Sequence, residues 1–122
     1  METSGKTASN LEFLEFLADI SSPATGEISV SRLANWLHQT EAELNEKWRT
    51  RGANLPWALF ADELLAVLDA AQDQTRHLNA VVKWYLGEPI ANFGMNTPQQ
   101  LVVAGKARRL AVAIRAREVL LP

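Results

Sequence analysis

Apolar side chains recur along most of this chain at steps of three and four residues, which places them on one face of a helix. The longest such stripe predicts a helix over about residues 54–72, and it consists of Trp57, Phe60, Ala61, Leu64, Leu68 and Ala71. Further stripes predict helices over about 10–20 and 78–86. No segment sustains the alternation of a β-strand, so we predict an all-α fold.

Two short helices are predicted in the N-terminal half. Ser29 or Ser31 can cap the first, which carries Leu33 and Leu37 as its buried positions. Thr40 begins the second, with a glutamate three residues later in the spacing of a capping box, and this helix ends near residue 51. A tight turn between two short helices is typical of a helix-turn-helix.

The first predicted helix has two possible partners. It follows a short polar tail over 1–9, begins at Ser9 or Asn10 and carries Leu11, Phe13 and Leu14 at helical spacing. This apolar side can pack on the body of the chain or dock across a dimer. The sequence leaves both arrangements open.

Glycines and prolines divide the C-terminal part of the chain into short helices. Gly87 suits the left-handed position after a helix, and Pro89 stops the helix from continuing. We expect a compact loop over 90–96, with Phe93 as its one large apolar anchor and Gly94 at positive φ.

A new helix is predicted directly after this loop. Thr97 is a good N-cap and Pro98 suits the first helical position, where its missing N–H costs nothing. Leu101 and its two following valines bury this short helix, Gly105 ends it, and a last helix starts at Lys106.

This arrangement resembles the toxin-binding domain of Xre/MbcA/ParS-type antitoxins over about residues 75–118. The matching positions are Tyr85, Leu86, Pro89, Phe93, Gly94, Thr97, Pro98, Leu101, Val102, Gly105 and Leu110. The chain departs from the family pattern at Tyr85, where tryptophan is usual, and at Met95, where a second glycine is usual. The segment SVSRLANWLHQTEAELNEKW resembles the Xre-like helix-turn-helix that commonly precedes this domain.

The resemblance implies an all-α chain in which a helix-turn-helix-like N-terminal unit packs with a small C-terminal helical toxin-binding domain. It divides the chain into the tail over 1–9, an Xre-like region with an extra N-terminal helix over 10–72, and the toxin-binding domain over 73–122. It also implies a homodimer that neutralises a RES-type, NAD-degrading toxin by covering its active site, and that binds operator DNA to repress its own operon. One alternative is a stand-alone helix-turn-helix transcriptional regulator that has lost toxin binding. Another is a homo-oligomeric scaffold with neither activity, which the apolar first helix would also suit.

Composition favours an ordinary globular protein. Apolar residues make up 48% of the chain and charged residues 21%, which is the balance of a soluble domain. The chain has no cysteine, which excludes disulfides and thiolate metal sites. It has no apolar run of membrane-spanning length, and its first residues lack the apolar core of a signal peptide. We therefore expect a cytoplasmic protein with no membrane partner.

The charges are unevenly distributed. The net charge of −2 weighs against strongly electrostatic binding of nucleic acid. Residues 1–27 hold five carboxylates against one lysine, whereas residues 105–122 hold five cations, Lys106, Arg108, Arg109, Arg115 and Arg117, against Glu118. The basic end suits an acidic partner surface, although solvated helix faces would give the same asymmetry.

Candidate DNA-binding residues lie on the two short helices and are all basic: Arg32, Lys47, Arg49 and Arg51. Three glutamates crowd the N-terminal half of the second helix, where they would repel phosphate. Glutamates at a helix N-terminus are equally well explained by the helix dipole. A dimer could still assemble a usable basic surface.

No catalytic arrangement is apparent. His38 and His77 stand far apart and outside any metal-ligand spacing, and the carboxylates Asp69 and Asp73 are best explained as a solvated helix face. We therefore predict a binding protein without a cofactor or a metal rather than an enzyme.

The last helix carries the candidate toxin-binding residues. Apolar side chains between arginines suit a protein interface, because arginine binds carboxylates with two hydrogen bonds while its apolar neighbours are desolvated. The candidates are Arg108, Arg109, Val112, Arg115, Val119 and Leu121. We also expect the apolar tail over 120–122 to be able to enter a groove of the partner. An ordinary amphipathic helix with exposed valines is the alternative.

Overall fold

The computed structural model describes residues 11–122, and every regular element in that range is a helix. The elements are α2 (Leu11–Ile20), α3 (Val30–Trp36), α4 (Glu41–Arg51), α5 (Trp57–Ala71), α6 (Leu78–Gly87), the 3₁₀ turn η1 (Ala91–Phe93), α7 (Pro98–Val103) and α8 (Ala107–Arg115). The predicted all-α fold is confirmed. The predicted tail over 1–9 and the proposed caps Ser9 and Asn10 lie outside the described residues.

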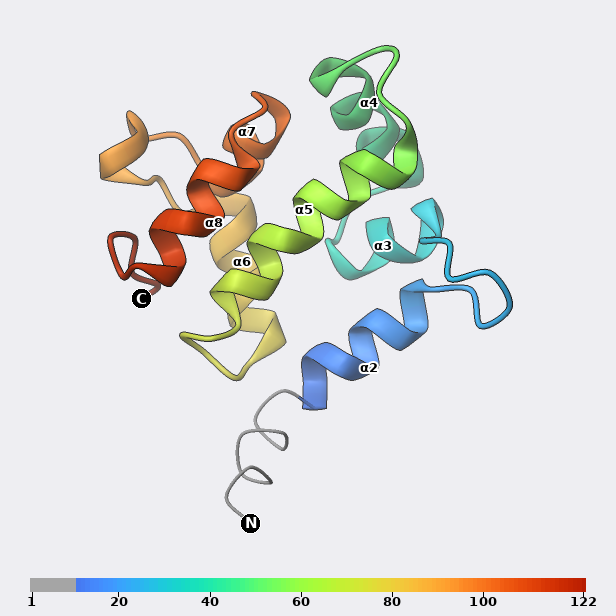
Figure 1. The fold of residues 1–122 in the computed structure, drawn as a ribbon, viewed down its shortest axis with the longest axis horizontal. Helices are drawn as coiled ribbons and strands as arrows, with labels where there is room; N and C mark the ends of the chain where they lie inside the picture. Colours follow the sequence, from blue (N-terminus) through green and yellow to red (C-terminus); the bar gives the residue numbers. More distant parts are fainter. Residues whose placement is uncertain (1–10) are drawn as a thin grey trace.

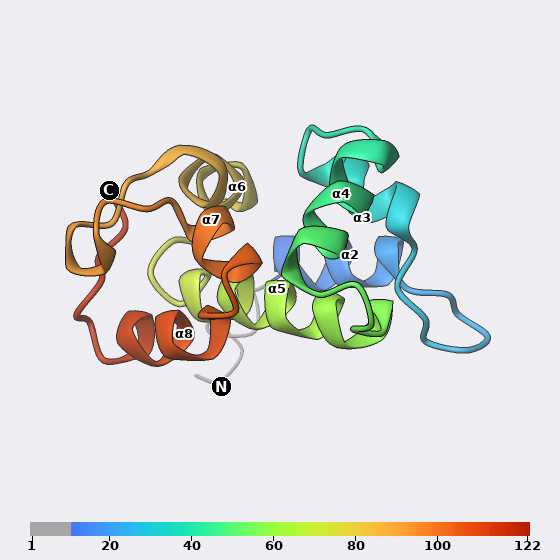
Figure 2. The same cartoon turned by 90° about the horizontal axis from the view of Figure 1, so that it is seen from above.

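Helix α5 is the spine of the molecule. It runs between an N-terminal lobe of α2, α3 and α4 and a C-terminal lobe of α6, η1, α7 and α8 (Figures 1 and 2). Its large side chains Phe60, Leu64 and Leu68 are completely buried. One hydrophobic core extends along this helix from Phe13 in α2 to Val119 beyond α8, so both lobes depend on α5 for their interior.

The short helices of the N-terminal lobe begin where the sequence predicted. The Ser29 hydroxyl caps α3 by accepting the N–H of Arg32 at 3.2 Å. Thr40 and Glu43 form the predicted capping box of α4, with hydrogen bonds of 3.0 and 2.7 Å. The turn between the two helices contains His38 at a φ of +58°, a conformation that non-glycine residues seldom adopt.

Helix α2 packs on the body of its own chain. Phe13, Phe16 and Ile20 are buried against the core, while Leu11 and Leu14, which share the predicted stripe, are exposed. The Glu12 carboxylate accepts the N–H of Leu78 at 2.8 Å, which ties α2 to the start of α6. The first of the two arrangements left open by the sequence is therefore the one observed.

Two details of the loop after α6 differ from prediction. Gly87 is not left-handed, because α6 includes it and the chain becomes extended at Glu88. Ile90 is the buried residue of the loop, while Phe93 is only half-buried, because Ile90 pairs with Asn96 in an isolated bridge that turns its side chain inward. Gly94 has the predicted positive φ, +69°.

Helices α7 and α8 begin as predicted. Thr97 caps α7, and Gln100 returns a hydrogen bond to the Thr97 N–H at 2.8 Å, completing a capping box. Pro98 occupies the first turn, and Gly105 at a φ of +82° separates α7 from α8. This left-handed turn sets the direction of α8, which runs alongside α5 in the same direction (Figure 1).

Candidate interaction surface

Helix α8 has one buried and one exposed face. Four residues, Ala107, Leu110, Ala113 and Ile114, are buried against the core. Arg108, Arg109 and Val112 are exposed, and Val112 has 63% of its surface open to solvent. This face therefore presents an exposed apolar side chain beside two arginines.

A hollow lies between this face and the loop over 90–96. Its main lining side chains are Phe93, Lys106, Arg108, Arg109 and Val112, with Glu118 at its edge. Among residues 11–122, none of the three cations forms an ion pair. The hollow therefore combines a positive excess with two apolar groups.

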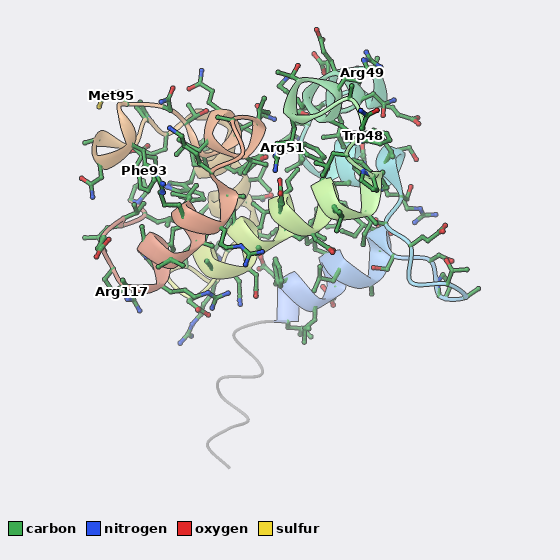
Figure 3. The ribbon with its side chains drawn as sticks, turned by 45° about the horizontal axis from the view of Figure 1, so that its top comes forward. Trp48, Arg49, Arg51, Phe93, Met95 and Arg117 are labelled. Atoms are coloured by element: carbon green, nitrogen blue, oxygen red, sulfur yellow. The ribbon has the colours of Figure 1, made fainter. Side chains whose placement is uncertain are left out.

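Hydrogen bonds hold the loop that forms the opposite wall. The Ile90 N–H donates to the Asn96 carbonyl at 2.9 Å, and the Asn92 amide donates to the Glu118 carbonyl at 2.7 Å. These bonds place Phe93 and Met95 together at the outer end of the C-terminal lobe (Figure 3). Met95 is 62% exposed at the tip, and thioether side chains adapt well to irregular protein surfaces.

Two predicted toxin-binding residues lie elsewhere. Val119 was predicted on the exposed stripe of α8, but it is only 4% exposed, because α8 ends at Arg115 and Arg117 turns the chain with a φ of +62°. Leu121 is half-buried, and its N–H donates to the Gln74 side chain at 2.9 Å.

Gln74 holds the C-terminal segment on its own lobe. Its amide nitrogen donates to the carbonyls of Ile114 at 3.1 Å and Val119 at 2.8 Å, while its oxygen accepts from Leu121. The tail that was predicted to enter a partner's groove is thus tied to its own chain at Leu121, while Leu120 is 66% exposed.

Arg115 is exposed but already engaged. Its guanidinium pairs with Asp69 in the last turn of α5 at 3.1 Å and with Asp73, just after that helix, at 3.3 Å. The arginines that remain unpaired within the described chain on α8 are thus Arg108 and Arg109. Of the predicted toxin-binding residues, Arg108, Arg109 and Val112 therefore remain exposed without an ion pair in the described chain. Lys106 and Phe93 lie beside them in the hollow.

The four candidate DNA-binding residues do not form one surface. Arg32 pairs with Asp19 at 2.9 Å on the N-terminal lobe. Arg51 lies between the lobes, while Arg49, in the same last turn of α4, points outward (Figure 3). Of the set, Lys47 and Arg49 form no ion pair within residues 11–122.

The Arg51 side chain is half-buried. It donates two hydrogen bonds of 2.9 Å to Glu63 of α5, and these bonds raise the pKa of the guanidinium. A β-carbon on Gly105 would lie 3.5 Å from its Cζ atom. Arg51 therefore joins α4, α5 and the turn before α8.

His38 and His77 are both exposed, at a turn and before α6, and residues 11–122 contain no group of three side chains that could hold a metal ion. None of the described helices is both long and apolar enough to cross a membrane.

Comparisons with protein-family models, with curated proteins and with solved structures found no match to this chain.

Proposed function

We propose that this chain is an antitoxin-like binding protein that neutralises a RES-type, NAD-degrading toxin by covering the approach to its active site. The observation that supports this most is the hollow beside α8, where Lys106, Arg108 and Arg109 surround the exposed Val112 and the half-buried Phe93. The resemblance of residues 75–118 to antitoxin toxin-binding domains supplies the class of partner.

The chemistry of this hollow favours an acidic protein surface. Arginine binds a carboxylate with two parallel hydrogen bonds, and an exposed apolar side chain gains from being desolvated beside it. Interfaces owe most of their affinity to a few such groups near their centre. Val112 and Arg109 are the natural centre here, because both project from a helix whose other face is fixed in the core.

Co-purification tests the proposal. A RES-type toxin encoded next to this chain should co-purify with the wild-type chain, whereas Arg109→Glu or Val112→Asp should abolish co-purification and leave the helical circular dichroism unchanged. Arg49→Glu is the matched control on the N-terminal lobe and should bind as the wild type does. Toxin that still co-purifies with Arg109→Glu would show that this surface does not bind it.

Operator binding is the second candidate, favoured by the capped α3–α4 pair and by Lys47 and Arg49, which form no ion pair within residues 11–122. It has less support, because Arg32 and Arg51 are engaged within the chain. A mobility-shift assay on the upstream DNA at two salt concentrations tests it, since phosphate contacts weaken as salt rises. The absence of a salt-sensitive shift would exclude DNA binding.

A further inference from the structure

A second groove lies between α8 and α5. It shares Arg108 and Val112 with the hollow described above but lies on their other side. Asp62 and Ala66 of α5 line one wall, Arg108 and Val112 of α8 line the other, and Leu59 lies at one end with 51% of its surface exposed. Two of the large apolar side chains that are exposed in the described chain, Leu59 and Val112, therefore border one groove.

Some charged side chains of this groove form ion pairs within the described chain, and two do not. Glu63 is held by Arg51, and Arg115 is held by the two aspartates at the end of α5. Asp62 and Arg108 are exposed and form no ion pair with any residue from 11 to 122. One free carboxylate thus stands on α5 and one free guanidinium on α8.

The register of the two helices places these groups within about one turn of each other. Arg115 contacts both Asp69 and Asp73, which are one turn apart, and the helices run in the same direction (Figure 1). Seven residues earlier on each helix, which is two turns, Arg108 lies level with the turn of α5 between Asp62 and Ala66. By the same count Val112 lies level with the turn that begins at Ala66, so a large side chain on one wall stands near a small one on the other.

We propose that a second copy of this chain occupies the α5–α8 groove across a twofold axis parallel to the two helices. Rotation about such an axis leaves every residue at the same height along the helices and places α5 of one copy opposite α8 of the other. Asp62 of each copy therefore pairs with the partner's Arg108. Val112 likewise packs against the partner's Ala66. A twofold interface requires a patch complementary to itself, and one acid, one base, one large and one small side chain at neighbouring levels meet that requirement.

This dimer goes beyond the proposed toxin binding and needs no toxin to form. Arg108 and Val112 line both the α5–α8 groove and the hollow proposed to bind the toxin. Asp62 and Ala66 line only the groove, and Arg109 lines only the hollow. Self-association through this groove and toxin binding should therefore exclude each other, so the toxin-binding form would be the monomer and not the homodimer that the family resemblance implies. Variants at the unshared positions separate the two proposals.

Sedimentation of the purified full-length chain tests the dimer through a charge exchange. The wild type should be dimeric, and Asp62→Arg and Arg108→Asp should each weaken the dimer by about tenfold or more, because each places like charges together twice. The double variant D62R/R108D should restore it. An equimolar mixture of the two single variants should also associate, because each supplies the charge that the other lacks.

Two further variants serve as controls. Ala66→Lys should abolish the dimer independently by filling the space for Val112, and circular dichroism should show that it is folded. Arg109→Glu should remain dimeric even though it loses the toxin. A wild type that sediments as a monomer throughout the micromolar range would overturn the proposal, as would single variants that dimerise like the wild type or a folded double variant that stays monomeric.

Discussion

Tyr85 shows how a single buried side chain links this fold to pH. It is the only tyrosine of the chain and is 1% exposed inside the C-terminal lobe. Burial penalises the phenolate and raises the pKa of Tyr85 above the ordinary value of about 10. The folded chain therefore keeps a proton that the unfolded chain releases in alkaline solution.

This difference predicts a loss of stability at high pH. Below about pH 10 the phenol is protonated in both states and contributes no pH dependence; above that, the unfolding free energy should fall by about 1.4 kcal/mol per pH unit from this group alone. Urea titrations from about pH 9 to about pH 11 should show that slope in the wild type relative to Tyr85→Phe. Equal slopes in the two proteins would mean that the phenol ionises in the folded chain.

Local sequence predicted the starts of elements better than their ends. Thr40 and Thr97 cap helices as predicted, because a capping hydrogen bond joins residues only three positions apart. The end of α8 had no such signal. Arginine has no preference for the left-handed conformation that Arg117 adopts, so nothing local indicated that Val119 would turn into the core.

The sequence predicted the exposed face of α8 but not the residues that surround it. The helical period placed Arg108 and Val112 on the exposed face, since side chains four residues apart share a face. It could not place Phe93 opposite them, because that proximity depends on how the loop folds back onto α8. It also could not foresee that Arg115 would be engaged by aspartates more than forty positions earlier in the chain.

Removing the cap of α7 should measurably loosen the C-terminal lobe. Thr97→Ala leaves the Gln100 N–H without its acceptor, and it should lower the unfolding free energy by about 1 kcal/mol. Thr50→Ala is the matched control, because its hydroxyl bonds the Glu46 carbonyl inside α4, where alanine is the better helix former. It should be neutral or slightly stabilising. Denaturant unfolding of both variants checks the contrast, and equal losses would contradict it.

The whole molecule is held together by α5 and by the contacts of Arg51, a residue that the sequence pattern predicted to bind DNA. Arg51 reaches Glu63 from a different helix and lies over the backbone of Gly105. No periodicity connects these three positions, so the sequence could not distinguish a structural arginine from a phosphate-binding one. The pair is half-buried, which makes its hydrogen bonds worth more than those of an exposed ion pair.

Breaking the contacts of Arg51 should cost more than removing an exposed arginine from the same helix. Arg51→Gln should lower the unfolding free energy by about 1–3 kcal/mol, because it leaves Glu63 with unsatisfied acceptors. Arg49→Gln should change it by less than about 0.5 kcal/mol. Urea unfolding of the two variants measures the difference. If Arg51→Gln is as stable as Arg49→Gln, the contacts of Arg51 do not stabilise the fold.

The proposed neutralisation of a RES-type toxin depends on the face of α8 around Arg109. The NAD content of cells that express this toxin together with the chain measures neutralisation directly. We expect the wild type and Arg49→Glu to preserve NAD, whereas Arg109→Glu, folded and present at the same level, should let it fall. NAD preserved equally well by Arg109→Glu would show that this face does not neutralise the toxin.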